Sequence, residues 1–456
     1  MGFGMTEKRR FRIIIAVLLA AGAIALLPGC MNVAAEELYS LPQLSEGYLR
    51  LQSHINAVLS RGAEFSPPTG GLNRQSVLLR DIDGDGIDEV IAFFSVPGES
   101  TLQIYIFRMI DGDYSVAEVI QGVGTAFESI RFVNMSDTAG LLEIVVGWQM
   151  GPVLRHMEIF TLRDFHAVSL ARVEYSELVV YDLTGNGRDD IIVIRAPTQE
   201  HGFIAAVYTL MPDGEIVMTE ARLSHGVEVV TNVIAGNLID GTPAIFVESE
   251  GRFEEGNAIN MVTDILIYQE GRIENISVIS DSGVSEETVR ARLYNSADID
   301  RDGAVKIPIP RLLRAQSETA YYAIDWYAYN SDGHSMLALT TYHNNNDEWF
   351  LILPFDWRGR VSIRREDDVA GERTVVFSAI SDSDEFNDFL KVYKITGDLR
   401  ENRATLPGRL RLMDEGSAVY AFEFLVPPNS YGLTFDEDLI RNSFRLMYLE
   451  WLAGGN

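Results

Sequence analysis

Between residues 72 and 343, short apolar runs follow turns that are rich in aspartate, asparagine and glycine. Five such turns occur, and they start at Asp81, Asn134, Asp182, Asn237 and Asp298. Apolar runs follow the first four turns at residues 90–94, 143–146, 191–194 and 244–247. Because the starts recur at a period of about 50 to 60 residues, the pattern indicates an internal repeat.

A second signal keeps step with these turns. An apolar stretch with a central aromatic residue follows each of the first four starts, at residues 103–107, 157–161, 206–209 and 265–268. Three of these stretches run into hairpin turns, which are Asp111-Gly112, Asp213-Gly214 and Glu270-Gly271. Each unit therefore predicts four antiparallel strands, the pattern of a propeller blade.

The pattern changes after residue 343. A strand followed by a turn is expected at 348–359, and further strands are expected at 361–364, 374–378, 390–395 and 418–425. Thr434 and Glu437 form a capping-box pair, and the apolar residues Ile440, Phe444, Met447, Tyr448 and Trp451 predict a terminal helix. The sequence thus predicts a mainly β protein: a β-propeller-like array of about five or more four-stranded blades at 72–343, and a small α+β domain at 344–456.

The N-terminal 29 residues read as a signal peptide. Four basic residues precede an apolar stretch at 13–27, which is shorter than the roughly 20 residues that a membrane-spanning helix needs. Leu27-Pro28-Gly29-Cys30 resembles a bacterial lipobox, and that resemblance implies a lipid on Cys30. The alternative is a plain signal peptide or membrane anchor with a chance cysteine. Residues 30–71 are expected to be a lipidated tether with one short helix, whose apolar face runs from Leu44 to Val58.

Charge narrows the range of partners. The chain has 66 acidic and 37 basic residues, a net charge of −29, so nucleic acid and anionic lipid are poor electrostatic partners. Removal of residues 1–29 leaves 33 basic and 65 acidic residues, so the body is repelled by an anionic membrane surface and depends on lipid for anchoring. The single cysteine excludes a disulfide framework and a multi-cysteine zinc site.

The acidic turns have the residue types of a calcium loop. Carboxylates at positions 1, 3, 5 and 9, with a backbone carbonyl at position 7, offer the oxygen ligands that calcium takes. In the first turn these are Asp81, Asp83, Asp85 and Glu89, with the carbonyl of Ile87. In the third turn they are Asp182, Thr184, Asn186 and Asp190, with the carbonyl of Arg188.

The turns differ in how strongly they favour calcium. Four carboxylates favour it in the first turn, and only two charged ligands make it less favoured in the third. In the fifth turn Lys306 holds position 9, where its ammonium group would compete with a metal ion. The alternative for every turn is a solvated Asp/Gly-rich hairpin.

The runs at 81–89 and 182–190 resemble the integrin-type FG-GAP or VCBS repeat. That resemblance implies a β-propeller whose acidic turns are braced by structural calcium. The segment from Leu353-Pro354 through Trp357 to Gly359 resembles a module of uncharacterised lipoproteins of Gram-positive bacteria, which brings no known activity.

Motifs for catalysis are lacking in the sequence. The seven histidines form no metal-binding pair, and there is neither a Gly-x-Ser-x-Gly elbow nor a glycine-rich phosphate loop. Glycosidase-type carboxylates on separate blades would leave no local motif, so an enzyme stays open. The favoured hypothesis is a lipid-anchored binding or scaffolding protein on the extracytoplasmic face of the cell membrane, with an unknown protein or glycan ligand. The alternative is an extracellular propeller hydrolase or lyase acting on glycan.

Overall fold

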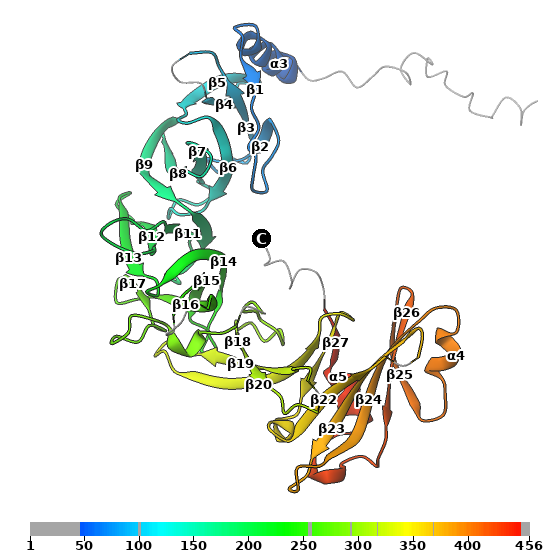
Figure 1. Cartoon of the computed structure of the whole chain (residues 1–456). Coiled ribbons are helices and arrows are strands. Elements are labelled where there is room, and N and C mark those ends of the chain that lie inside the picture. Colours follow the sequence, from blue (N-terminus) through cyan, green and yellow to red (C-terminus); the bar gives the residue numbers. More distant parts are fainter. Residues whose placement is uncertain are drawn as a thin grey trace, which may run out of the picture. The chain divides into compact units, whose positions relative to one another are not determined.

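The computed structural model describes residues 46–98, 102–253, 258–291, 294–316, 318–367 and 369–447. The predicted signal peptide, Cys30 and most of the predicted tether lie outside the described residues. Two compact units are present, one made of residues 46–60 and 109–115 and the other of the remaining described residues. Figure 1 shows the elements in chain order.

The smaller unit pairs a helix with a hairpin tip. Helix α3 (Glu46–Leu59) confirms the predicted helix, and its residues Leu51 and Val58 are buried. Arg50 forms an ion pair with Asp113 at 2.5 Å, and the rings of Tyr48 and Tyr114 lie 6.1 Å apart. The helix thus packs against the turn between β4 (Leu102–Ile110) and β5 (Asp113–Gln121).

Four consecutive antiparallel sheets form the first part of the larger unit (Figure 1). Sheet 1 contains β1 (Glu64–Phe65), β2 (Val77–Arg80), β3 (Glu89–Ser95), β4 (Leu102–Ile110) and β5 (Asp113–Gln121). Sheet 2 contains β6 (Ala126–Val133), β7 (Glu143–Gln149), β8 (Arg155–Arg163) and β9 (His166–Tyr175). Sheet 3 contains β10 (Glu177–Tyr181), β11 (Asp190–Arg195), β12 (Ile204–Leu210) and β13 (Ile216–Arg222). Sheet 4 contains β14 (Val227–Asn237), β15 (Pro243–Gly251), β16 (Asn260–Gln269) and β17 (Arg272–Asn275).

Sheet 5 departs from this scheme. It contains β18 (Ile307–Leu312), β19 (Tyr322–Tyr329), β20 (Ser335–Asn344), β21 (Trp349–Leu353) and β27 (Phe444–Leu446). Its first strand is reduced to a bridge between Ala297 and Lys306. The predicted domain boundary after residue 343 falls inside this sheet, because β20 and β21 pair across it.

Sheet 6 carries most of the C-terminal region. It contains β22 (Val361–Glu366), β23 (Glu372–Ile380), β24 (Phe386–Thr396), β25 (Arg409–Glu415) and β26 (Ala418–Phe424), in the order β22-β23-β24-β26-β25. Helix α4 (Arg400–Ala404) follows β24, and short 3₁₀ helices lie at η1 (Glu286–Thr288), η2 (Phe355–Trp357) and η3 (Ser430–Gly432). The sheet with its helices agrees with the predicted small α+β region.

The terminal helix is shorter than predicted. Helix α5 (Glu437–Ser443) begins at Asp436, whose side chain accepts a hydrogen bond from the Leu439 N–H, and not at Thr434. Phe444 belongs to strand β27, which pairs with β21. The capping-box prediction was wrong because Asp436 is an equally good cap two residues further along the chain. Tyr448 and Trp451 lie outside the described residues.

The sheets pack face to face in chain order. Along β11, Ile191 and Val193 join a core shared with sheet 2, whereas Ile192 and Ile194 join a core shared with sheet 4. Successive side chains of a strand point to opposite faces, so one central strand serves two cores. This explains why the predicted strands are continuous apolar runs, and it confirms a mainly β, propeller-like array of blades.

Sheets 5 and 6 also share one core. Leu351 of β21 and Phe377 of β23 belong to the same buried cluster. Asp347 lies in the turn between β20 and β21 and is buried. Its carboxylate forms an ion pair with the guanidinium of Arg373 of β23 at 2.7 Å. The turn that contains Asp347, just after the predicted domain boundary at residue 343, therefore joins the two sheets.

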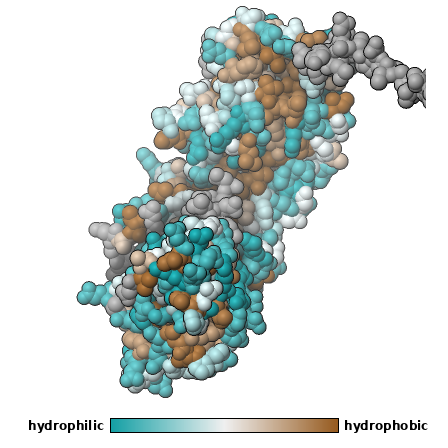
Figure 2. Space-filling view, turned by 90° about the vertical axis from the view of Figure 1, so that its right-hand side faces the viewer, coloured by the Kyte–Doolittle hydropathy of each residue, from teal (hydrophilic) through white to brown (hydrophobic). Residues whose placement is uncertain are grey.

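The surface is not uniformly polar. Figure 2 shows hydrophobic residues gathered on the upper part of the face in view, whereas hydrophilic residues dominate the lower part. The chain that enters sheet 1 exposes large apolar side chains at Phe65, Leu72 and Leu79, and Leu72 is 94% exposed. Exposed apolar areas of this kind are typical of interaction surfaces.

Candidate metal centre

The acidic turns occupy the same place in their sheets. Each turn joins two neighbouring antiparallel segments, and the cross-strand pair that closes it contains the first residue of the strand after the turn or the residue just before that strand. That residue is Glu89, Glu143, Asp190 or Lys306 in sheets 1, 2, 3 and 5. The shorter turn of sheet 4 has Pro243 there.

In the first turn, Asp81 organises the backbone. Its two carboxylate oxygens accept hydrogen bonds from the N–H groups of Gly84 at 2.7 Å and Gly86 at 2.9 Å. Both glycines have positive φ, near +81° and +84°, which a glycine adopts without strain. Gly84 also packs against Gly140 of the next turn so closely that a Cβ would lie 2.7 Å from the Gly140 Cα.

Glu89 completes a group of three carboxylates. One oxygen from each of Asp81, Asp83 and Glu89 lies within 4.8 Å of the others. Glu89 is fully buried, and its Oε2 accepts a hydrogen bond from the Ile82 N–H at 3.1 Å. Within the described part of the chain its Oε1 has no hydrogen-bond partner. Burial, with added repulsion from Asp83, Asp85 and Asp81, raises the pKa of Glu89 to about 7.

The remaining predicted ligands of this turn are arranged differently. Asp85 does not belong to the three-carboxylate group. Its Oδ1 accepts the N–H of Ile87, and its Oδ2 lies 3.3 Å from Arg108. Arg108 also contacts Asp83 at 3.0 Å, and its guanidinium lies over the ring of Phe165 at 3.8 Å. Sequence reasoning missed Arg108, whose place beside the turn follows from the pairing of β3 with β4.

The third turn has the same backbone arrangement with fewer free oxygens. Asp182 accepts the N–H groups of Asn186 and Gly187 at 3.0 and 2.8 Å. Asp190 accepts the N–H of Thr184 at 2.9 Å and the hydroxyl of Thr209 at 2.8 Å. Both oxygens of the buried Asp190 are therefore satisfied by the protein.

The side chain and the N–H of Arg188 have partners within the protein, whereas its carbonyl, the predicted ligand, stays a prediction. Its side chain forms an ion pair with Asp137 at 2.6 Å, while its N–H donates to the side-chain oxygen of Asn186. Burial raises the pKa of Asp190 above its ordinary value. The arrangement fits a protein-satisfied turn better than a metal site, although the Thr184 hydroxyl is buried without a hydrogen-bond partner among the described residues.

In the fifth turn a lysine fills the centre. The Lys306 ammonium is fully buried and lies 2.5 Å from Asp300 Oδ1 and 2.6 Å from Asp302 Oδ1. Burial alone would lower the pKa of Lys306, but the hydrogen bonds that it donates to these two carboxylates raise it above its ordinary value. The ammonium lies where sequence reasoning expected it to compete with a metal ion.

The second turn uses a buried acid that sequence reasoning did not single out. Glu143 accepts the Met135 N–H at 3.0 Å and lies 3.4 Å from the Thr161 hydroxyl. Glu143 is fully buried, and burial raises its pKa. A signal was present in the sequence, because Glu143 precedes its apolar run just as Glu89 and Asp190 precede theirs.

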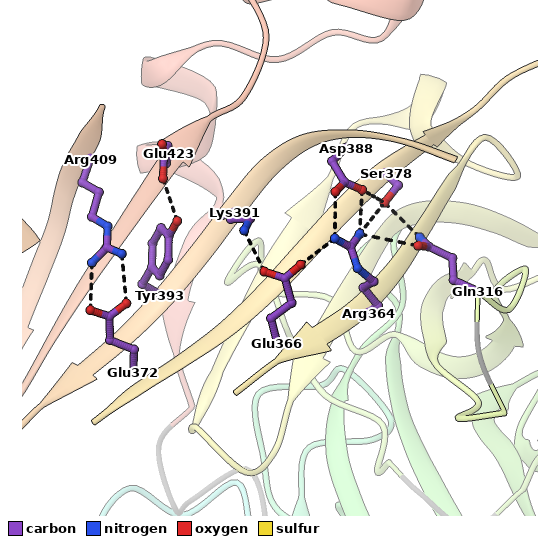
Figure 3. A network of polar contacts seen from close by, with 10 residues as sticks. All are labelled: Gln316, Arg364, Glu366, Glu372, Ser378, Asp388, Lys391, Tyr393, Arg409 and Glu423. Atoms are coloured by element: carbon purple, nitrogen blue, oxygen red, sulfur yellow. Dashed lines mark hydrogen bonds and ion pairs between the residues drawn. The ribbon is translucent and has the colours of Figure 1, made fainter. Parts of the chain in front are cut away.

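A separate polar network covers one face of sheet 6, and Figure 3 shows its members paired with one another. Arg364 binds Asp388 with two hydrogen bonds of 2.6 and 2.7 Å, and Glu366 contacts Lys391 at 2.7 Å. Burial raises the pKa of both acids, but these hydrogen bonds outweigh it, so each pKa is lowered. A glycosidase needs one carboxylic acid that keeps its proton near neutral pH, so this face does not favour the hydrolase alternative.

Among the described residues, no helix is long and apolar enough to cross a membrane.

Comparison with known proteins adds little. No protein-family model matches the chain, and no curated protein matches it. Among solved structures, a protein from Lactobacillus plantarum is similar over 64% of this chain and 92% of its own, with 10% sequence identity and a TM-score of 0.18. The architecture of the chain follows from its own topology, a mainly β array of stacked, blade-like sheets.

Proposed function

We propose that this protein is a lipid-anchored binding or scaffolding protein of the cell surface, and that its first acidic turn holds a structural calcium ion. The observation that carries the calcium site is Glu89, a fully buried carboxylate whose Oε1 has no partner among the described residues. One carboxylate oxygen of Glu89 lies with one each of Asp81 and Asp83 in a single group. Leaving a buried charged oxygen unsatisfied is costly, and a cation supplies the missing partner.

Calcium suits this group better than other common cations. It takes six to eight oxygen ligands in flexible geometry, whereas magnesium demands a near-ideal octahedron and retains its water. Asp81, Asp83 and Glu89 would hold the ion, and the ion would supply positive charge and no catalysis. The resemblance of residues 81–89 to the FG-GAP repeat supports the same conclusion.

The turn lies where an ion braces more than one sheet. Gly84 contacts Gly140, and the Leu142 N–H donates to the Ile82 carbonyl at 3.0 Å. A cation that fixes the first turn therefore also fixes the junction between sheets 1 and 2. In this proposal the sheets form a rigid support, and the exposed apolar residues near Leu72 contribute to a surface for a protein or glycan ligand.

Thermal unfolding in calcium and in chelator tests the metal site. A ligand at a hundred times its dissociation constant adds about 2.7 kcal/mol when only the folded state binds it. We expect calcium to raise the unfolding temperature clearly and magnesium to raise it much less. Asp83→Ala combined with Asp85→Ala should remove most of the calcium shift.

The matched control is Asp300→Ala combined with Asp302→Ala. This variant should lose stability because the buried Lys306 ammonium loses two carboxylate partners. The rise in its unfolding temperature on adding calcium should equal that of the wild type. If neither calcium nor chelator changes the unfolding temperature of the wild type, the first turn is only a solvated hairpin.

The lipid anchor has its own test. In the proposal a lipid on Cys30 holds the acidic body at the extracytoplasmic face of the membrane, and two or more acyl chains anchor stably. Cys30→Ala should release the protein from membranes or leave it uncleaved, and it should abolish labelling by a radioactive fatty acid. Labelling that persists in the variant would refute the anchor.

A further inference from the structure

Arg108 is the feature of the first turn that has no counterpart in sheets 2 and 3. Its register places it across from Glu89, because the neighbouring pair is Val90 with Phe107. At the same register, Thr161 lies across from Glu143 and Thr209 lies across from Asp190. Those threonine hydroxyls lie 3.4 and 2.8 Å from the buried acids, whereas Arg108 reaches past Glu89 to the outer carboxylates.

We infer that Arg108 is a tethered competitor of the metal ion: a cation enters the first turn by displacing the Arg108 guanidinium from Asp83 and Asp85, so Arg108 sets the affinity of the site. This inference rests on the proposed calcium site and adds how that site is controlled.

The contacts of Arg108 are suited to exchange. The guanidinium lies 3.0 Å from Asp83 and 3.3 Å from Asp85, and its side chain is 30% exposed. Partly exposed ion pairs of this kind are individually weak, so an entering divalent ion can replace them. A calcium ion bound by Asp83 would repel the guanidinium at close range, so the two cations exclude each other.

Phe165 provides a place for the displaced side chain. The guanidinium already lies 3.8 Å above the Phe165 ring, a cation–π contact that does not involve the carboxylates. Arg108 can therefore leave Asp83 and Asp85 and still keep one favourable contact. Phe165 belongs to the turn between β8 and β9, so the exchange also affects a contact between sheets 1 and 2.

The fifth turn shows the other outcome of the same competition. There the cation is Lys306, which directly precedes β18, is fully buried and lies within 2.6 Å of two carboxylates. A buried ammonium held this closely does not exchange. Arg108 reaches its turn from a neighbouring strand, with longer contacts and partial exposure, so the first turn can be loaded.

The test is calcium titration by calorimetry on the full chain in detergent. Arg108→Thr introduces the residue found at this register in sheets 2 and 3, and we expect its calcium dissociation constant to fall roughly tenfold, which corresponds to about 1.4 kcal/mol. Phe165→Ala should weaken binding by a smaller factor, because the displaced guanidinium then loses the ring that receives it. Arg108→Lys keeps the charge without the fork that reaches both carboxylates, and it should give an intermediate value.

Arg163→Thr is the matched control. It removes the same charge from the equivalent end of β8, where Arg163 contacts the Gly214 carbonyl and not the first turn. Its dissociation constant for calcium should stay within twofold of the wild type.

If Arg108→Thr and Arg108→Lys both bind calcium with wild-type affinity, the inference is overturned and the calcium site stands. If neither wild type nor variants bind calcium, the proposed function itself fails. Should Arg108→Thr not fold, Phe165→Ala and Arg108→Lys decide the question.

Discussion

The first and fifth acidic turns have similar backbone conformations and differ in the residue at position 9. Asp81 accepts N–H groups of the residues three and five positions later, and Asp298 accepts those four and five positions later. At position 9 the first turn has the buried acid Glu89, and the fifth has the buried base Lys306. The first turn therefore concentrates negative charge, whereas the fifth neutralises its own.

The backbone conformation of these turns and the charge at their centre depend on different residues. In both turns the leading aspartate holds the loop through backbone hydrogen bonds, which need no metal ion. Position 9 then decides whether the required cation is part of the chain or comes from solution. The fifth turn thus places a cation of the chain at the centre of the loop, whereas the first turn has an acid at position 9 and is reached only by Arg108 from a neighbouring strand.

Reversing the charge at position 9 of the fifth turn should have the largest effect on stability. Lys306→Glu replaces a buried ammonium by a carboxylate among Asp298, Asp300 and Asp302. Breaking a buried ion pair costs about 3–5 kcal/mol, and we expect about 3 kcal/mol or more here because the three aspartates are partly exposed. Urea unfolding in chelator measures this loss, and saturating calcium should recover most of it.

Lys306→Met serves as the control for that experiment. It removes the ammonium without adding a carboxylate, so it should lose stability but recover less with calcium. Equal recovery by the two variants, or none by Lys306→Glu, would show that position 9 does not select the cation.

The pH dependence of stability should differ between the two turns. Glu89 has a pKa of about 7 in the folded protein, against an ordinary value of 4.5. The folded state therefore holds this proton more tightly, so its contribution is complete below about pH 4.5 and disappears as pH rises through about 7. The loss should be about 3 kcal/mol in chelator.

Glu89→Gln isolates that contribution. The raised pKa values of Glu143 and Asp190 add to the slope in both proteins, so the difference between wild type and Glu89→Gln reports Glu89 alone. Saturating calcium should flatten the difference. Because the pKa of Lys306 is raised, its contribution is retained through this range and lost only at alkaline pH. Identical slopes for wild type and Glu89→Gln in chelator would contradict the assignment.

The smallest effect is expected in the third turn. Asp182→Asn weakens two backbone hydrogen bonds and should cost about 1 kcal/mol, but it should change the calcium-induced shift by less than about 0.5 kcal/mol. The reason is that the oxygens of Asp190 are already satisfied by Thr184 and Thr209. Differential scanning calorimetry with and without calcium measures both quantities. Loss of the calcium shift in Asp182→Asn would place the ion in the third turn instead.

The repeat could be predicted from the sequence because its signals are local. An Asp/Gly turn specifies its own backbone hydrogen bonds, and the apolar run after it marks a strand that is buried on both faces. For the same reason the competition between Lys306 and a metal ion could be foreseen, since position 9 lies within the turn. The C-terminal helix shows the limit of such signals, because Thr434 and Asp436 are both good caps and tertiary pairing of β27 with β21 decided where the helix ends.

The sequence by itself determined the strand pattern, the acidic turns and which turn has its own cation. Only the tertiary structure decided that Arg108 lies across from Glu89, that Asp85 leaves the carboxylate group, and that residues 344–353 continue sheet 5. The physical reason is that these features depend on which strands pair and in what register. Hydrogen bonds between strands join residues distant along the chain, and no local pattern of polar and apolar positions specifies those partners.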